Sequence, residues 1–143
     1  MPLVGENRIL VRNGIPLVGD TRNVGLRALL DTAGISGNID AYHLGFVIGP
    51  RFNAAGRLGS ADMAIELLLT DDRGRAGEIA LALEDANRTR RAVEKETTER
   101  VAAAVEKSFD PGRDFCVVAA EEGLHAGVIG LVASRLSGLY TRP

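Results

Sequence analysis

The chain of 143 residues has no tryptophan, one cysteine and two histidines. A single cysteine excludes an internal disulfide and any metal site built from several thiolates. Cys116 lies in an apolar run, so we expect a buried thiol there. Aromatic residues make up only 4% of the chain, so its core must rely on leucine, isoleucine, valine and alanine. His43 and His125 lie far apart without an acidic cluster beside either, and they predict no metal centre.

The chain also lacks a strong net charge and a long apolar run. Its formal net charge is −2, so contact with nucleic acid would have to come from a local basic patch. No apolar run approaches the ~20 residues of a membrane-spanning helix. The N-terminus does not show the basic-then-apolar pattern of a signal peptide. These features predict a globular cytoplasmic protein with no membrane partner.

The common catalytic motifs are missing too. The sequence contains no phosphate-binding P-loop, no His-Glu-x-x-His, no dinucleotide glycine fingerprint and no Ser-His-Asp spacing. A metal-dependent phosphoesterase needs carboxylates and histidines gathered around its cations, and no such cluster is visible. The sequence therefore predicts that this chain alone holds no complete catalytic centre.

Residues 45–61 carry the most distinctive pattern that is present. An apolar run ends at Gly49-Pro50, where the proline is expected to push Gly49 out of the helical region. Arg51, Asn53 and Arg57 follow, separated by small residues that let a backbone approach a ligand. Because guanidinium groups offer paired donors to phosphate oxygens, the pattern favours contact with a phosphodiester. The alternative is a solvated loop that caps neighbouring helices.

Elsewhere the pattern predicts mainly helices. A strand hairpin is possible over residues 9–18, and helices are expected at about 21–33, 40–46 and 60–70. A long helix is expected over 73–107, with apolar positions at both ends and a charged middle that suits a connector between two domains. Regular heptads of a coiled coil are absent.

The charged middle of this long helix has three arginines in four positions, Arg88, Arg90 and Arg91. Pairs such as Glu84–Arg88 and Glu96–Arg100 have the favourable i,i+4 order. Two interpretations stay open here. The arginines are either a solvated helix surface or a lining for a nucleic-acid backbone.

After a Pro-Gly break at 109–112, the pattern predicts a buried strand over Phe115–Ala120 and a helix from His125 to Leu136. One strand and one helix cannot bury both of their faces, so we expect the sequence to be an internal fragment of a longer protein. The expected fold class is α/β overall but mostly helical in this fragment. An unpaired strand edge also allows a non-native dimer.

Three motifs, in order, resemble the RecJ family, the single-strand-specific 5′-to-3′ exonucleases of the DHH phosphoesterase superfamily. The first is Pro50-Arg51-x-Asn53-Ala54-Ala55-Gly56-Arg57, and the second is Asn87-Arg88-x-Arg90-Arg91, similar to a pattern on the family's connecting helix. The third, from His125 to Leu136, resembles the start of the family's DHHA1-type domain. Leu124 stands where the family usually has tryptophan.

The resemblance implies three regions. Residues 1–72 would be the C-terminal part of a DHH catalytic domain, 73–108 the connecting helix, and 109–143 the truncated first strand-helix unit of a DHHA1-type α/β domain. The parent protein would use Mn²⁺ or Mg²⁺, and none is expected to be bound by this fragment, because the family's metal-ligand motifs are absent from it.

The function implied is that of a metal-dependent exodeoxyribonuclease hydrolysing single-stranded DNA in recombination and repair, of which this fragment is an inactive part. The residues expected to contact the strand or its end group are Arg51, Asn53, Arg57, Arg88, Arg91, His125, Ser134 and Arg135. Two alternatives remain. One is another DHH phosphoesterase acting on oligonucleotides or cyclic dinucleotides, and the other is a non-enzymatic helical interaction module.

Overall fold

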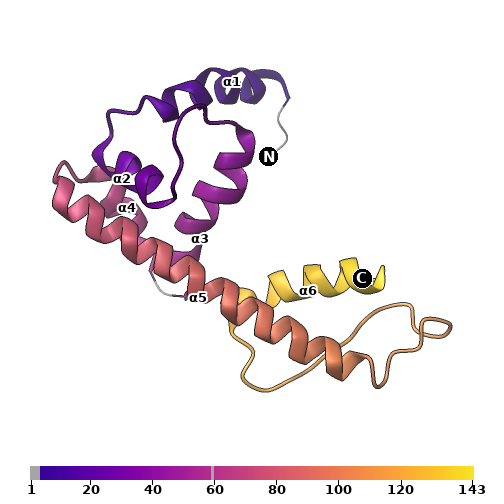
Figure 1. Cartoon of the computed structure of the whole chain (residues 1–143). Coiled ribbons are helices and arrows are strands. Elements are labelled where there is room, and N and C mark those ends of the chain that lie inside the picture. The colour runs from indigo at the N-terminus through magenta and orange to yellow at the C-terminus, as the bar shows by residue number, and fades with distance from the viewer. Residues whose placement is uncertain (1–3, 59) are drawn as a thin grey trace. The chain divides into compact units, whose positions relative to one another are not determined.

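The computed structural model describes residues 4–58 and 60–143 and is built mainly of helices (Figure 1). In chain order the elements are α1 (Gly5–Gly19), α2 (Val24–Thr32), the π-helix η1 (His43–Ile48), α3 (Gly49–Leu58), α4 (Asp62–Leu69), α5 (Arg73–Val105) and α6 (Ala126–Tyr140). The mostly helical character was predicted correctly. The chain forms two compact units, Met1–Asn87 and Arg88–Pro143.

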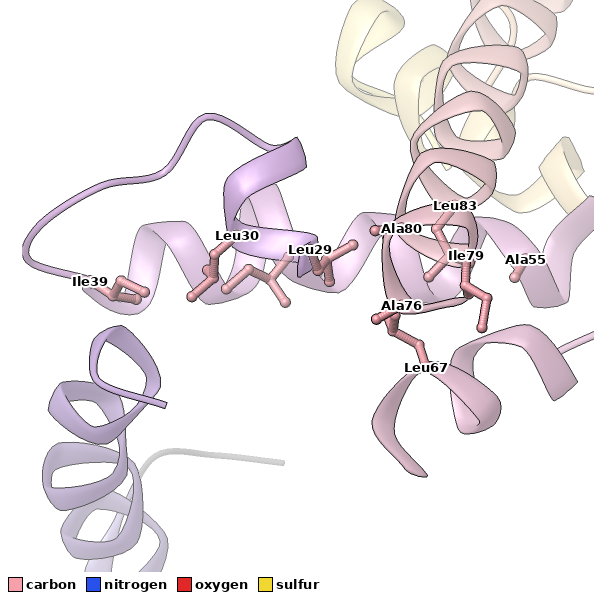
Figure 2. Packing of buried hydrophobic residues seen from close by; sticks show 10 residues of the cluster. Leu29, Leu30, Ile39, Ala55, Leu67, Ala76, Ile79, Ala80 and Leu83 are labelled. Carbon is pink, nitrogen blue, oxygen red and sulfur yellow. The ribbon is translucent and has the colours of Figure 1, made fainter. Parts of the chain in front are cut away.

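The first unit packs around a cluster of ten buried apolar residues. Leu29 and Leu30 come from α2, Leu67 from α4, and Ile79 and Leu83 from α5, as Figure 2 shows. Helices α2 and α4 approach closely because α2 has glycine at its second position. A Cβ at that position, residue 25, would lie 1.7 Å from the carbonyl oxygen of Leu67.

The second unit has a smaller core. Val101 and Val105 of α5 pack with Val132 and Leu136 of α6. The hydroxyl of Tyr140 donates a hydrogen bond of 3.3 Å to the carbonyl of Ala102, which adds a polar tie between the two helices.

The expected hairpin over residues 9–18 is wrong, because this segment lies within α1. The helix carries Pro16 near its end and buries none of its residues, so its apolar positions gave no clear helical stripe. The next helix also starts later than expected. Asn23 caps α2 by accepting a 2.8 Å hydrogen bond from the N–H of Leu26, whereas the hydroxyl of Thr21 accepts one from the N–H of Asn23.

The chain around Gly49-Pro50 is helical, contrary to the prediction. Gly49 has φ −54° and ψ −45°, and its N–H donates to the carbonyl of Leu44, five residues back. This wider π-turn leads straight into α3, and Pro50 lies in the first turn of that helix. The central motif is therefore a helix rather than a loop.

The long helix predicted over 73–107 is confirmed as α5, and the helix predicted from His125 forms as α6. Along the chain, the division between the two compact units falls after Asn87, inside α5. The predicted domain limits at residues 72 and 108 thus lie near the two ends of α5. The assignment of three domains stays a prediction.

The expected strand over Phe115–Ala120 is wrong for this chain, because the segment is irregular and no strand forms anywhere in 4–58 or 60–143. Phe115 and Val118 are 86% and 84% exposed. Cys116 is likewise exposed rather than buried. A strand needs a neighbour for its backbone groups, and here the N–H of Val117 donates to the carbonyl of Pro143, at 2.9 Å, in place of a ladder of such bonds.

None of the helices in the described part of the chain is long and apolar enough to cross a membrane. Dimerisation through the segment at 115–120 stays a prediction.

Candidate nucleic-acid interface

Arg51 is engaged inside the first unit. Its Nε donates to Oε2 of Glu84 at 2.6 Å, and its Nη1 donates to the carbonyl of Val47 at 2.5 Å. Only 12% of the side chain is exposed. The guanidinium therefore joins α3 to α5 and holds the end of η1, which gives this arginine a structural role whatever else it contacts.

The rest of the central motif divides between core and surface. Ala54 and Ala55 are 0% and 2% exposed, so these small residues serve close packing rather than the approach of a ligand. Asn53 is exposed and Arg57 is partly exposed. The two polar residues are four positions apart on α3 and thus share one face of the helix.

The arginines in the middle of α5 differ in their surroundings. Arg88 and Arg91, three positions apart, are exposed and lie on one side of the helix. Arg90 is instead 13% exposed and pairs with Glu94 at 2.5 Å. The structure thus brings two of the three guanidiniums to the surface of the second unit.

Glu94 is the centre of a buried ionic cluster that sequence reasoning missed. Its carboxylate is 7% exposed and accepts from Arg90 on one oxygen and from Arg135 of α6 on the other, each at 2.5 Å. Arg135 keeps 65% of its side chain exposed. Because the partner on α6 is 41 residues away, only the i,i+4 spacing of the first pair was visible in the sequence.

The two other residues expected at this surface lie at α6. His125 is the N-cap of the helix, and its Nδ1 accepts a 3.1 Å hydrogen bond from the N–H of Gly127. Ser134 is exposed on the helix itself. The histidine thus has a capping role that the sequence did not reveal.

The residues whose pKa values are clearly shifted are not among the expected site residues. A side-chain hydrogen bond from Arg75 lowers the pKa of Glu66, and the carboxylates of Glu66 and Glu78 raise the pKa of Arg75. The backbone N–H and the side chain of His43 lower the pKa of Asp40. None of these groups forms a catalytic pair with a predicted site residue.

No group of three or more histidine, cysteine, aspartate or glutamate residues that could hold a metal ion occurs in the ranges that the structure describes. Those residues therefore do not fit a divalent cation. What the arrangement offers is positive charge and hydrogen-bond donors on helix surfaces.

The known proteins and solved structures compared with this chain are all RecJ proteins, although no family model matches the chain. The single-stranded-DNA-specific exonuclease RecJ of Bacillus subtilis is 33% identical over 145 residues, which cover 100% of this chain and 18% of that protein. The same exonuclease from Thermus thermophilus is 38% identical over 142 residues, which cover 99% of this chain and 20% of that protein. The Escherichia coli protein is 35% identical over 149 residues, covering 100% and 26%.

Solved structures agree. The crystal structure of RecJ from Thermus thermophilus in complex with Mg²⁺ matches with a TM-score of 0.84 and 35% identity, over 100% of this chain and 22% of that one. A crystal structure of exonuclease RecJ bound to manganese matches with a TM-score of 0.84 and 36% identity, over 99% and 35%. The chain spans 18% to 26% of the length of the curated relatives compared, and along its whole length it is similar to one section of RecJ.

Proposed function

We propose that the chain is a strand-binding section of a RecJ-type exonuclease that hydrolyses single-stranded DNA from the 5′ end with Mn²⁺ or Mg²⁺, in recombination and repair. The observation that carries this proposal is the similarity along the whole chain, at a TM-score of 0.84 to the Mg²⁺-bound relative. In such a protein residues 109–143 would begin a DHHA1-type domain, and a neighbouring strand would let Phe115–Ala120 pair.

The part of this chain is to bind and orient the strand rather than to perform chemistry. Exposed Arg88 and Arg91 suit the sugar-phosphate backbone, because guanidinium donors match phosphate oxygens. Asn53 and Arg57 offer a second set of donors on α3. Arg51 contributes chiefly by holding α3 in place, since its donors already serve Glu84 and a carbonyl.

The α6 residues complete the proposed contacts. His125 is exposed at the N-terminus of the helix, where backbone N–H groups favour an anion such as an end phosphate. Ser134 is exposed in the middle of the helix, where its hydroxyl can donate to the strand. Arg135 presents the exposed part of its guanidinium while Glu94 holds its Nε. These positions would contact the strand or its end group.

Fluorescence anisotropy of a 5′-phosphorylated single-stranded oligonucleotide tests the proposal. Binding should weaken with salt, and Arg88→Ala should reduce the slope of log affinity against log salt by about 0.7, the value for one phosphate contact on a single strand. Lys107→Ala removes an exposed charge beyond the end of α5 and is the matched control. An affinity that does not change with salt, or an equal loss of affinity in both variants, would contradict the assignment.

The proposed inactivity of the chain alone needs a separate assay. We expect no release of nucleotides from single-stranded DNA by the purified chain with Mn²⁺ or Mg²⁺. Hydrolysis that disappears in Arg57→Ala would refute this expectation. A cyclic dinucleotide added as a competitor distinguishes the related phosphoesterase alternative, because strong competition would favour a short substrate.

A further inference from the structure

Two aromatic side chains stand out on the surface of the first unit. Tyr42 and Phe46 are 62% and 72% exposed, yet their rings stack on each other with centroids 5.1 Å apart and an angle of 25° between planes. The other tyrosine, Tyr140, packs instead against Phe109 at the core of the second unit. The pair thus presents ring surface to solvent rather than to the core of its own unit.

The pair lies on a helical segment whose start is hydrogen-bonded to the residues before it. Asp40 accepts a 3.1 Å hydrogen bond from the N–H of His43 and lies 2.7 Å from the Nδ1 of that residue, which fixes the start of the helical segment. The His43 ring meets the Tyr42 ring edge-on, with centroids 6.1 Å apart. Because η1 carries Phe46 and runs directly into α3, the position of the rings is tied to the helix that follows.

Polar donors follow the rings on this continuous helical segment. Asn53 and Arg57 come about two and three turns after Phe46, and the four side chains are separated by four, seven and four residues along the sequence. Positions at such spacings lie on neighbouring parts of a helix surface. Exposed rings and phosphate-binding groups are the two components with which proteins hold a single strand.

We propose that Tyr42 and Phe46 form a stacking platform for the bases of a single-stranded nucleic acid whose backbone runs past Asn53 and Arg57. This proposal rests on the proposed function and adds to it the groups that contact bases. Every base has a flat π-face, so stacking accepts any sequence, whereas a paired duplex hides those faces. The platform would therefore favour unpaired strands without reading their sequence.

The chain offers a direct reporter, because it has two tyrosines and no tryptophan. Tyr140→Phe keeps the ring that packs on Phe109 and leaves Tyr42 as the only strong fluorophore. In this background we would titrate the full chain with an oligothymidylate of about 15 nucleotides, and with an abasic strand of equal length and charge. Stacking predicts quenching of the Tyr42 emission by the thymidylate alone.

Variants then test the second ring. Phe46→Ala should weaken thymidylate binding about tenfold, since loss of one stacked base corresponds to roughly one power of ten in affinity, and should leave abasic binding unchanged. Phe46→Tyr keeps an aromatic ring and should restore binding. Phe115→Ala removes an aromatic side chain that is even more exposed, in the second unit, and should have no effect. Far-UV circular dichroism checks that each variant folds.

The outcomes separate this inference from the proposed function. Equal, salt-dependent binding of both strands without selective quenching would overturn the platform and leave the phosphate contacts standing. Absence of binding by either strand would overturn both. Equal quenching by the two strands would also reject stacking, because the abasic strand has no bases to stack on the rings.

Discussion

The two compact units of this chain keep their helices together in different ways. Among the residues that the structure describes, the apolar cluster of the first unit has ten buried members and that of the second has four. The second unit also contains an apolar pocket of about 160 Å³, lined by residues that include Val101, Leu124 and Val132. Its helices are joined in addition by the buried carboxylate of Glu94. Burial thus dominates in one unit, whereas an ionic cluster supplements a small core in the other.

Matched leucine substitutions should show the largest difference in stability between the two units. Leu29→Ala removes a fully buried side chain from the larger core and should lower the free energy of unfolding by about 2–5 kcal/mol. Leu136→Ala, beside the pocket, should fall near the lower limit of this range, because its surroundings are less tightly packed. Urea denaturation followed by circular dichroism gives both values.

Leu17→Ala is the control, since this leucine is 71% exposed on α1 and its loss should change stability by less than about 0.5 kcal/mol. A larger loss in Leu136→Ala than in Leu29→Ala would contradict the difference between the two cores.

The same contrast explains what the sequence could predict. The long helix α5 was correctly predicted because its composition and periodic ends are local signals. Helix α1 was missed because it buries no residue and carries Pro16, so local patterning was weak. The strand over Phe115–Ala120 was wrong because strand formation depends on a neighbour, which a strand-like composition does not supply.

The candidate site shows a similar limit. The motif identified Arg51 and Arg135 as important residues, but their carboxylate partners lie 33 and 41 residues away and were not predictable. The sequence suggested Glu84–Arg88 as a helical pair, whereas Glu84 binds Arg51. Tertiary packing therefore decides which charges are used inside a unit and which remain at its surface.

Removing the ionic cluster of the second unit should have the next largest effect after Leu29→Ala. Glu94→Gln keeps the shape of the side chain but leaves two guanidiniums without their buried counter-charge, and should cost about 3 kcal/mol of stability. Glu99→Gln, at an exposed pair with Lys95 at 3.9 Å, should cost less than about 0.5 kcal/mol. Equal small losses in urea denaturation would show that burial of Glu94 matters little.

The corresponding substitution in the first unit separates stability from binding. Arg51→Gln removes the ion pair with Glu84, and we expect a loss of about 1–3 kcal/mol in unfolding free energy with little change in DNA affinity. Arg88→Gln, on an exposed side chain, should instead lower the DNA affinity and change the unfolding free energy little. Denaturation and anisotropy on the same samples test this, and a folded Arg51→Gln protein that no longer binds would make Arg51 a contact residue.

Acid titration should have the smallest effect, and a similar one in both units, because it concerns one exposed carboxylate, Asp40, and one partly exposed carboxylate, Asp114. Hydrogen bonds from His43 hold the pKa of Asp40 below its ordinary 3.8, and hydrogen bonds from Arg113 and the N–H of Asp110 do the same for Asp114. A lowered folded-state pKa stabilises the protein above the unfolded value, and this stabilisation disappears as the pH falls through the folded-state pKa.

Asp40→Asn and Asp114→Asn should therefore each reduce stability slightly at pH 7, and the difference from the parent chain should vanish in strong acid. Carboxyl chemical shifts followed by NMR give the two pKa values directly. A pKa at or above 3.8 for either group would mean that its hydrogen bonds do not persist in solution. Similar small effects in the two units would leave burial, and not surface charge, as the origin of their difference.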